Sequence, residues 1–151
     1  MAVHVRVNID AEFDRGSPIG RRDAAETIRR AAQATLRDHG ILDAGISLTL
    51  LGDTEIAEMN RTYLRHEGPT DVISFPLHDA DEPPLGDVYI GWEQALRQAE
   101  AHGVDPAEEL MRLAIHGTLH VLGYDHPDGE ERLESEMWRR QEAILRSLEG
   151  V

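Results

Sequence analysis

Four short stretches of the chain have the residue pattern of β-strands. Residues 3–9 and 46–51 alternate between apolar and polar positions, which is the period of a half-buried strand. A third strand is predicted over residues 70–76, where a proline closes it, and a fourth over residues 86–91. Residues 78–84 are acidic and rich in proline, so we expect an exposed loop between the last two strands.

Apolar residues that recur at helical spacing predict about five helices. Their expected ranges are residues 21–39, 53–64, 93–102, 106–122, and from 128 or 129 to 148. Aspartate is a favoured N-cap residue, and an aspartate stands at the start of both the second and the fourth range, as Asp53 and Asp105.

Strands and helices follow one another irregularly, which favours an α+β fold over a doubly wound α/β fold. We therefore expect a small mixed four-stranded sheet packed with about five helices. The 151 residues show no repeat, linker or low-complexity tract, and this length lies within the usual range of one domain. The sequence predicts a single domain over residues 1–151.

The helix predicted over residues 106–122 carries a histidine pattern with the spacing of a metal site. His116 and His120 are four residues apart, so they stand one turn apart on the same helical face. Gly123 follows as a residue that can end the helix, and His126 can then return as a third ligand. Three protein ligands leave a fourth tetrahedral position open, which is the arrangement of a catalytic zinc site at the end of a buried helix. The alternative is three histidines that are merely hydrogen-bonded near a helix end.

The same spacing, H-x-x-x-H-x-x-G-x-x-H, occurs in metzincin metallopeptidases, with one difference. Those enzymes have a glutamate directly after the first histidine as the general base, and this chain has Gly117 there. A glycine in a helix costs about 1 kcal/mol relative to alanine, so we expect another chain segment or the substrate to approach closely at this position. Met137 could lie below the metal as a methionine does in metzincins, but its helical spacing with Leu133 and Ile144 favours a core role.

The amino-acid composition indicates the cellular environment in which the protein works. The chain is 40% hydrophobic and 29% charged, as expected for a soluble globular protein. It has no apolar run near the roughly 20 residues of a membrane span, and its start lacks the apolar core of a signal peptide. We therefore expect a cytoplasmic protein without membrane contact. Cysteine is absent, so zinc can be held only by nitrogen and oxygen ligands.

The net charge of -14 argues at face value against a nucleic-acid partner. The charges are unevenly distributed, because residues 1–39 hold seven arginines against six acidic residues. Only this first third could offer a basic face, formed by the row Arg22, Arg29, Arg30 and Arg37 on the first helix. The row is either a solvated helix face or part of a phosphate-binding surface.

Four segments in this order resemble the YbeY family of bacterial zinc-dependent endoribonucleases. They are residues 60–63 (NRTY), 69–76 (PTDVISFP), 85–88 (LGDV) and 116–126 (HGTLHVLGYDH). The resemblance implies that His116, His120 and His126 bind one zinc ion. It further implies cleavage of single-stranded RNA, 3′-end processing of small-subunit ribosomal RNA, and ribosome quality control. The implied partners are therefore single-stranded RNA, ribosomal RNA and the small ribosomal subunit, and no DNA is expected.

One position departs from the family pattern. Many members have a functional arginine directly after the aromatic residue that aligns with Tyr63, whereas this chain has Leu64 there and Arg65 next. Zinc can lower the pKa of a bound water to about 7, and an arginine can stabilise the phosphate by bidentate contact. We therefore expect Arg65 and the ligand His116 to be the catalytic residues. Three candidates for a general base stay open, namely Asp125, Asp71 and His66.

Two other functions remain possible at this point. The histidine spacing would also suit a zinc metallopeptidase-like hydrolase, although Gly117 replaces the base that a peptidase needs. The acidic charge and the lack of an identifiable base would suit a non-catalytic, zinc-stabilised ribosome-binding factor.

Overall fold

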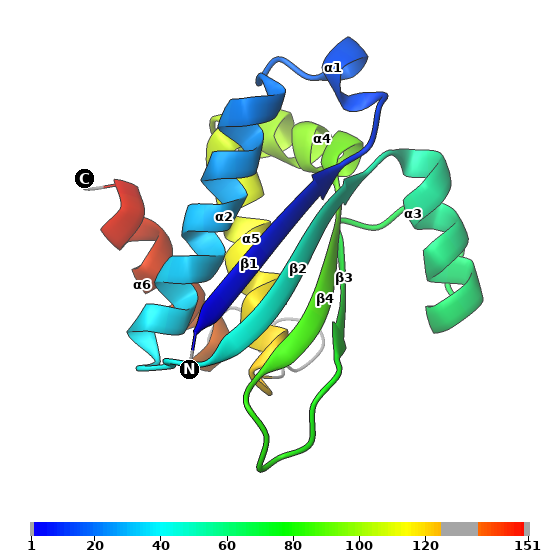
Figure 1. Ribbon diagram of the computed structural model, residues 1–151. Helices are drawn as coiled ribbons and strands as arrows, with labels where there is room; N and C mark the ends of the chain where they lie inside the picture. Colours follow the sequence, from blue (N-terminus) through cyan, green and yellow to red (C-terminus); the bar gives the residue numbers. More distant parts are fainter. Residues whose placement is uncertain (1, 125–135, 150–151) are drawn as a thin grey trace.

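The computed structural model describes residues 2–124 and 136–149, and Figure 1 shows how their helices and strands are arranged. The elements in chain order are β1 (Val3–Ile9), α1 (Phe13–Gly16), α2 (Arg21–Asp38), β2 (Ala44–Leu51), α3 (Asp53–Met59), the π-helical turn η1 (Asn60–Leu64), β3 (Val72–Pro76), β4 (Leu85–Gly91), α4 (Trp92–His102), α5 (Pro106–Val121) and α6 (Glu136–Glu149).

The strands form one mixed sheet in the order β1-β2-β4-β3. β1 pairs parallel to β2, β2 pairs parallel to β4, and the edge strand β3 pairs antiparallel to β4. β3 and β4 are consecutive in the chain and are joined by a loop over residues 77–84, in which most side chains are exposed. The predicted α+β fold with a small mixed four-stranded sheet is therefore confirmed.

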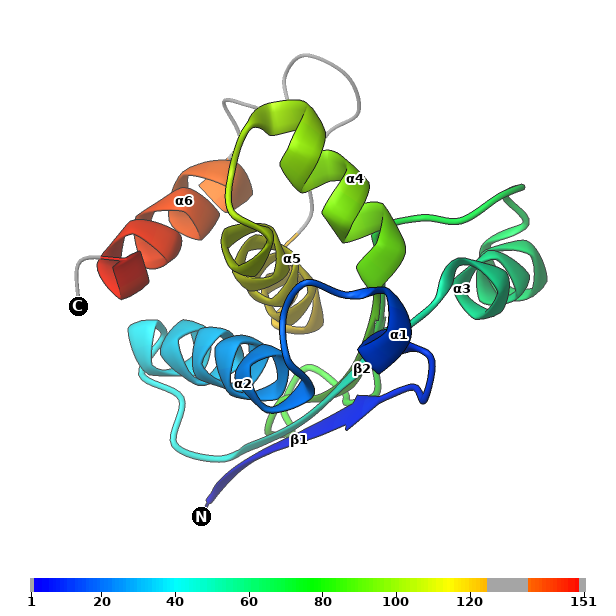
Figure 2. The ribbon, with the colours of Figure 1, turned by 90° about the horizontal axis from the view of Figure 1, so that it is seen from above.

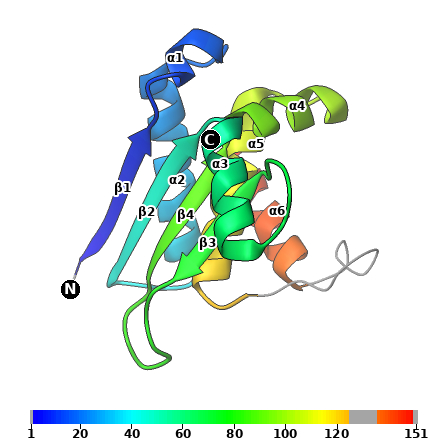
Figure 3. The same ribbon diagram turned by 90° about the vertical axis from the view of Figure 1, so that its right-hand side faces the viewer.

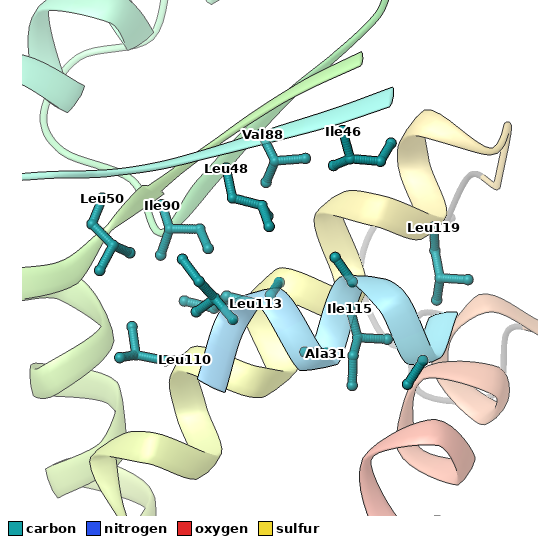
Figure 4. Packing of buried hydrophobic residues seen from close by; sticks show 14 of the residues in the cluster. Ala31, Ile46, Leu48, Leu50, Val88, Ile90, Leu110, Leu113, Ile115 and Leu119 are labelled. Atoms are coloured by element: carbon teal, nitrogen blue, oxygen red, sulfur yellow. The ribbon is translucent and has the colours of Figure 1, made fainter. Parts of the chain in front are cut away.

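Helices α2 and α5 lie side by side on one face of this sheet, and α6 packs outside them (Figure 2). The strand residues that face α2 and α5 are apolar, and Figure 4 shows them meeting the helices around Leu48, Val88 and Leu113. Small residues of α2 such as Ala31 are fully buried in this layer. The largest apolar cluster of the described residues is thus built around α5, the helix that carries the histidine pair.

On the opposite face of the sheet, α3 and η1 lie over the end near β3 (Figure 3). Because strand side chains alternate between faces, Ile73 of β3 points away from α5 and packs with Leu51 and Ile56 in a separate small cluster. Met59, Phe75 and Tyr89 pack against its rim and stay partly exposed. The two faces of the sheet therefore differ strongly in how much apolar cover they have.

Several details differ from the predicted elements. The short helix α1 was not expected, and the helix over residues 53–64 is divided into α3 and η1. Its N-cap is Gly52 rather than Asp53. Other segments already satisfy the amides there, since Glu93 Oε1 accepts from the Asp53 amide at 2.9 Å. The Asp53 carboxylate instead accepts two hydrogen bonds from Arg97, at 2.8 and 2.9 Å.

The remaining boundaries agree closely with expectation. Asp105 caps α5 as predicted, with Pro106 at the first helical position. The expected start of the last helix, near residue 128, lies outside the described residues, and α6 ends at Glu149. No helix within residues 2–124 and 136–149 is long and apolar enough to cross a membrane.

Candidate active site

Helix α5 holds its histidines on a firmly placed backbone. At its start, the Asp105 carboxylate accepts from the Ala107 amide at 2.8 Å, which satisfies one of the amides that a helix leaves unpaired. Beyond its first turn nearly every residue up to Val121 is buried or half-buried between the sheet, α2, α4 and α6. Gly123, at φ 101°, ends the helical segment as predicted.

Gly117 lies where α5 packs closely against the sheet. A β-carbon at this position would overlap Val88 Cγ1 and would lie 3.2 Å from both Ser74 Oγ and Val72 Cγ2. The Ser74 hydroxyl also donates to the Gly117 carbonyl at 3.2 Å. The expected close approach of another chain segment is confirmed, and that segment is the sheet itself. A glutamate here would point into β3 and β4, so position 117 has no room for a peptidase base.

The rings of His116 and His120 lie next to each other on α5. Their ring centres are 4.8 Å apart and the ring planes meet at 75°. Two imidazoles bound to one tetrahedral zinc through bonds of 2.0–2.1 Å would have ring centres about 5 Å apart, so the pair fits zinc. His116 is buried and His120 is half-buried.

The third predicted ligand, His126, and the candidate base Asp125 lie outside the described residues. Within the ranges that are described, no group of three or more His, Cys, Asp or Glu side chains could hold a metal ion. The described part of the chain therefore supplies two of the three expected ligands.

Gln141 of α6 is a polar partner of His116 that the sequence did not predict. Its Oε1 lies 2.7 Å from His116 Nδ1, and Gln141 is only 2% exposed. A metal-binding histidine commonly donates its second ring N–H to such an oxygen. The sequence held a signal for it, because Gln141 follows Met137 by four residues and so shares the buried face of α6.

An ion cluster lies one helical turn before His116. Arg112 donates to Glu142 of α6 at 3.0 and 3.2 Å, to Glu109 at 2.9 Å and to Glu108 at 3.2 Å. Burial on its own would lower the pKa of Arg112, but its hydrogen bonds and charge interactions with Glu142 and Glu109 outweigh burial and raise it. Burial raises the pKa of Glu109 despite the opposing effect of Arg112. The cluster ties α6 to α5 beside the candidate site.

A cavity of about 490 Å³ opens between α4, α5 and α6, and both His116 and Gln141 line it. Asp71, directly before β3, lines the same cavity, and its Oδ2 accepts from Gln98 at 3.2 Å. Of the two candidate bases within the described residues, Asp71 therefore lines the same cavity as His116. His66 lies in an exposed loop and is not among the residues that line this cavity.

Arg65 lies at the end of the π-helical turn, away from this cavity. Its backbone is left-handed, with φ 58°, and its side chain is exposed. The Asn60 carbonyl accepts from the amides of both Arg65 and His66, and Asn60 Nδ2 donates to the Gly68 carbonyl at 2.9 Å. These bonds fix the turn from which Arg65 projects. Among the described residues, Arg65 takes part in no ion pair.

Arg29, from the arginine row of α2, lies beside the edge strand β1 rather than in the cavity of His116. Arg29 pairs with Glu26 at 3.3 Å and shares a surface groove with Arg6 of the edge strand β1. The sheet order β1-β2-β4-β3 places this edge at the opposite end from β3, whose residues contact Gly117. Met137 is 1% exposed within the main apolar cluster, so its expected role as core is confirmed.

Comparisons with known proteins point to one family. The profile of the endoribonuclease YbeY family matches residues 10–149. A protein of Moorella thermoacetica named endoribonuclease YbeY is 42% identical over 140 residues, which cover 85% of this chain and 88% of that protein. One of Bacillus velezensis with the same name is 40% identical over 135 residues, covering 82% and 85%. The solution structure of TM1509 from Thermotoga maritima superposes with a TM-score of 0.67 at 24% identity, covering 97% of this chain and 89% of that one, and so supports the fold.

Proposed function

This chain belongs to the endoribonuclease YbeY family, and from that premise we propose that it is a zinc-dependent hydrolase that cuts single-stranded RNA. The observation that carries the proposal is the histidine pair, whose ring centres stand 4.8 Å apart on a buried helix. Membership of this family does not favour the metallopeptidase-like and non-catalytic alternatives. The close contact of Gly117 with Val88 also leaves no space for a peptidase base.

His116, His120 and His126 would hold the zinc ion, which when bound supplies a Lewis acid and a water of lowered pKa. His116 enters this set through Nε2, since its Nδ1 faces Gln141. Asp71, which lines the same cavity as His116, is the proposed acceptor of a proton from the attacking group. The long apolar contact of α5 with the sheet keeps the two ring positions fixed while the substrate binds.

Arg65 would contact a phosphate of the RNA. A left-handed backbone costs a non-glycine residue about 1 kcal/mol, and residues kept in such conformations are often functional. Here the position carries a long cation that is exposed, and a guanidinium suits bidentate contact with phosphate. Arg65 is therefore the proposed phosphate-binding residue in place of an arginine at Leu64.

The proposed substrate and setting follow from the family. We expect the natural substrate to be ribosomal RNA and the reaction to be 3′-end processing of small-subunit ribosomal RNA. The expected partner is the small ribosomal subunit, and the expected location is the cytoplasm. A chain of net charge -14 repels RNA over most of its surface. Binding must therefore depend on a few local cations, and it should weaken steeply as salt rises.

The test combines metal content with RNA cleavage. Purified protein should contain about one zinc per chain and should cut a defined single-stranded RNA, and a chelator should stop the cleavage. His120→Ala should lose most of the zinc and the activity. The matched control is His4→Ala on the exposed side of β1, which should keep both. Full zinc content in His120→Ala would show that the zinc is not bound at this site. Cleavage that continues in the presence of chelator would show that the reaction does not need zinc.

A further inference from the structure

We infer that Gln141 is a positioning residue that fixes the proton of His116 on Nδ1, and that Glu142 and Arg112 hold Gln141 in the orientation that does so. The inference deepens the proposed function, because it assigns the C-terminal helix α6 a role at the metal site. Two of the four residues, Gln141 and Glu142, come from α6, and the other two come from α5.

The first step is the contact between the two buried side chains. His116 is 8% exposed and Gln141 is 2% exposed, and the Nδ1 to Oε1 distance is 2.7 Å. An amide group has an oxygen that accepts and a nitrogen that donates. The contact alone therefore does not decide which ring nitrogen carries the proton, because a rotated amide would present its nitrogen to the ring.

Glu142 decides the orientation of the Gln141 amide. Gln141 Nε2 lies 3.1 Å from Glu142 Oε2, and an ionised carboxylate can only accept hydrogen bonds. Both Glu142 oxygens also accept hydrogen bonds from Arg112, whose Nε and Nη2 donate to them at 3.0 and 3.2 Å. The amide nitrogen must then face Glu142, and the amide oxygen must face His116.

The orientation of the amide fixes the tautomer of the histidine. Since Gln141 Oε1 can only accept, His116 Nδ1 must carry the proton, and the ring lone pair lies on Nε2. Partners of this kind set the tautomer and the ring orientation of metal-binding histidines, and their loss typically weakens metal binding 10- to 100-fold. The hydrogen bonds that link Arg112, Glu142, Gln141 and His116 thus set the tautomer of one metal ligand before any metal binds.

The experiment reads the tautomer without metal or RNA. Nitrogen-15 NMR of metal-free protein near pH 8.5, where an ordinary imidazole is neutral, should show His116 protonated on Nδ1. Gln141→Leu should populate the Nε2 tautomer and weaken zinc binding about 10- to 100-fold in a titration with zinc alone. Gln141→Glu, which keeps an accepting oxygen, should restore the Nδ1 tautomer and zinc binding close to that of the wild type.

Two further variants complete the test. Gln98→Leu removes an amide that lines the same cavity but donates to Asp71 rather than to a histidine, and it should change neither the tautomer nor the zinc affinity. Glu142→Gln lets residue 142 donate as well as accept, so a second His116 tautomer should appear. An unchanged tautomer and zinc affinity in Gln141→Leu would overturn the inference, and an unchanged tautomer in Glu142→Gln would overturn the role of Glu142. Neither result depends on whether the protein cuts RNA.

Discussion

Helix α5 and the α3–η1 segment each carry a residue proposed for the same reaction, but the fold holds them in different ways. α5 lies between the sheet and three other helices, with most of its residues buried. Between them, α3 and η1 bury only Ile56 and Asn60, and the segment ends in an exposed turn. Metal ligands must be held to a fraction of an ångström, whereas an arginine that meets a phosphate can adjust through its long side chain. The difference in packing matches this difference in required precision.

The acidic side chains of the two regions have different partners. Around α5, Glu108, Glu109 and Glu142 all pair with Arg112. In α3, burial and then the neighbouring acidic groups Asp10 and Glu12 raise the pKa of Glu55. Three carboxylates thus share one arginine beside α5. In α3, Asp53 and Glu58 pair with Arg97 and Arg61, whereas Glu55 faces other acidic groups.

The largest expected effect tests how tightly α5 sits on the sheet. Gly117→Ala places a β-carbon against Val88 and close to Ser74 and Val72. Overpacking of this kind costs about 1–3 kcal/mol, which should exceed the roughly 1 kcal/mol that alanine gains over glycine in a helix. We expect a lower free energy of unfolding in urea and weaker zinc binding.

The matched control for this variant is Ala143→Gly, the reverse exchange at an exposed position of α6. It should cost about 1 kcal/mol from helix propensity alone and leave zinc binding unchanged. If Gly117→Ala were as stable as the wild type, the contact between α5 and the sheet would be looser than the structure indicates, and the contrast with α3–η1 would weaken.

A smaller effect of opposite sign is expected at Arg65. Arg65→Gly should stabilise the protein by about 1 kcal/mol, because glycine adopts a positive φ without the cost paid by other residues. Arg65→Ala keeps that cost and should leave stability nearly unchanged. Both variants should weaken RNA binding equally and should reduce its salt dependence by about 0.7 in the logarithmic slope, as for one lost contact to single-stranded RNA.

Thermal unfolding and RNA titration at several salt concentrations measure these two quantities separately. Equal RNA binding by Arg65→Gly, Arg65→Ala and the wild type would place the phosphate contact elsewhere. The arginine row of α2 would then be the next surface to test, through Arg22→Glu combined with Arg29→Glu.

The smallest effect concerns Glu55 and pH. Burial and then Asp10 raise the pKa of Glu55 above 4.5, so the folded protein binds this proton more tightly than the unfolded chain. The resulting stabilisation is complete below the unfolded pKa and is lost as pH rises through the folded value. Glu55→Gln should therefore melt slightly higher than the wild type at pH 7, with the difference shrinking toward pH 4. Glu67→Gln, in an exposed loop, serves as the control, and an equal difference at both pH values would exclude this origin.

Local residue patterns were enough to predict most of the secondary structure and to select the candidate metal ligands. Strand and helix periods, the Asp105 cap and the spacing of His116 and His120 are short-range features, so they can be read along the chain. The same patterns carried the resemblance to the YbeY family, which the comparisons confirmed.

The surroundings of those residues depend on how distant segments pack. Gln141 is 25 positions from His116, and Asp71 reaches the same cavity from another element. The direction in which Gly117 faces and the position of Arg29 beside β1 follow from the way helices lie on the sheet. The predicted helix over residues 53–64 is divided into α3 and η1. At the start of η1, Asn60 binds the Gly68 carbonyl, which lies outside that helix. Such contacts are fixed by the shape of the whole packed core. Helical spacing can indicate that Gln141 is buried, but it does not identify His116 as its partner.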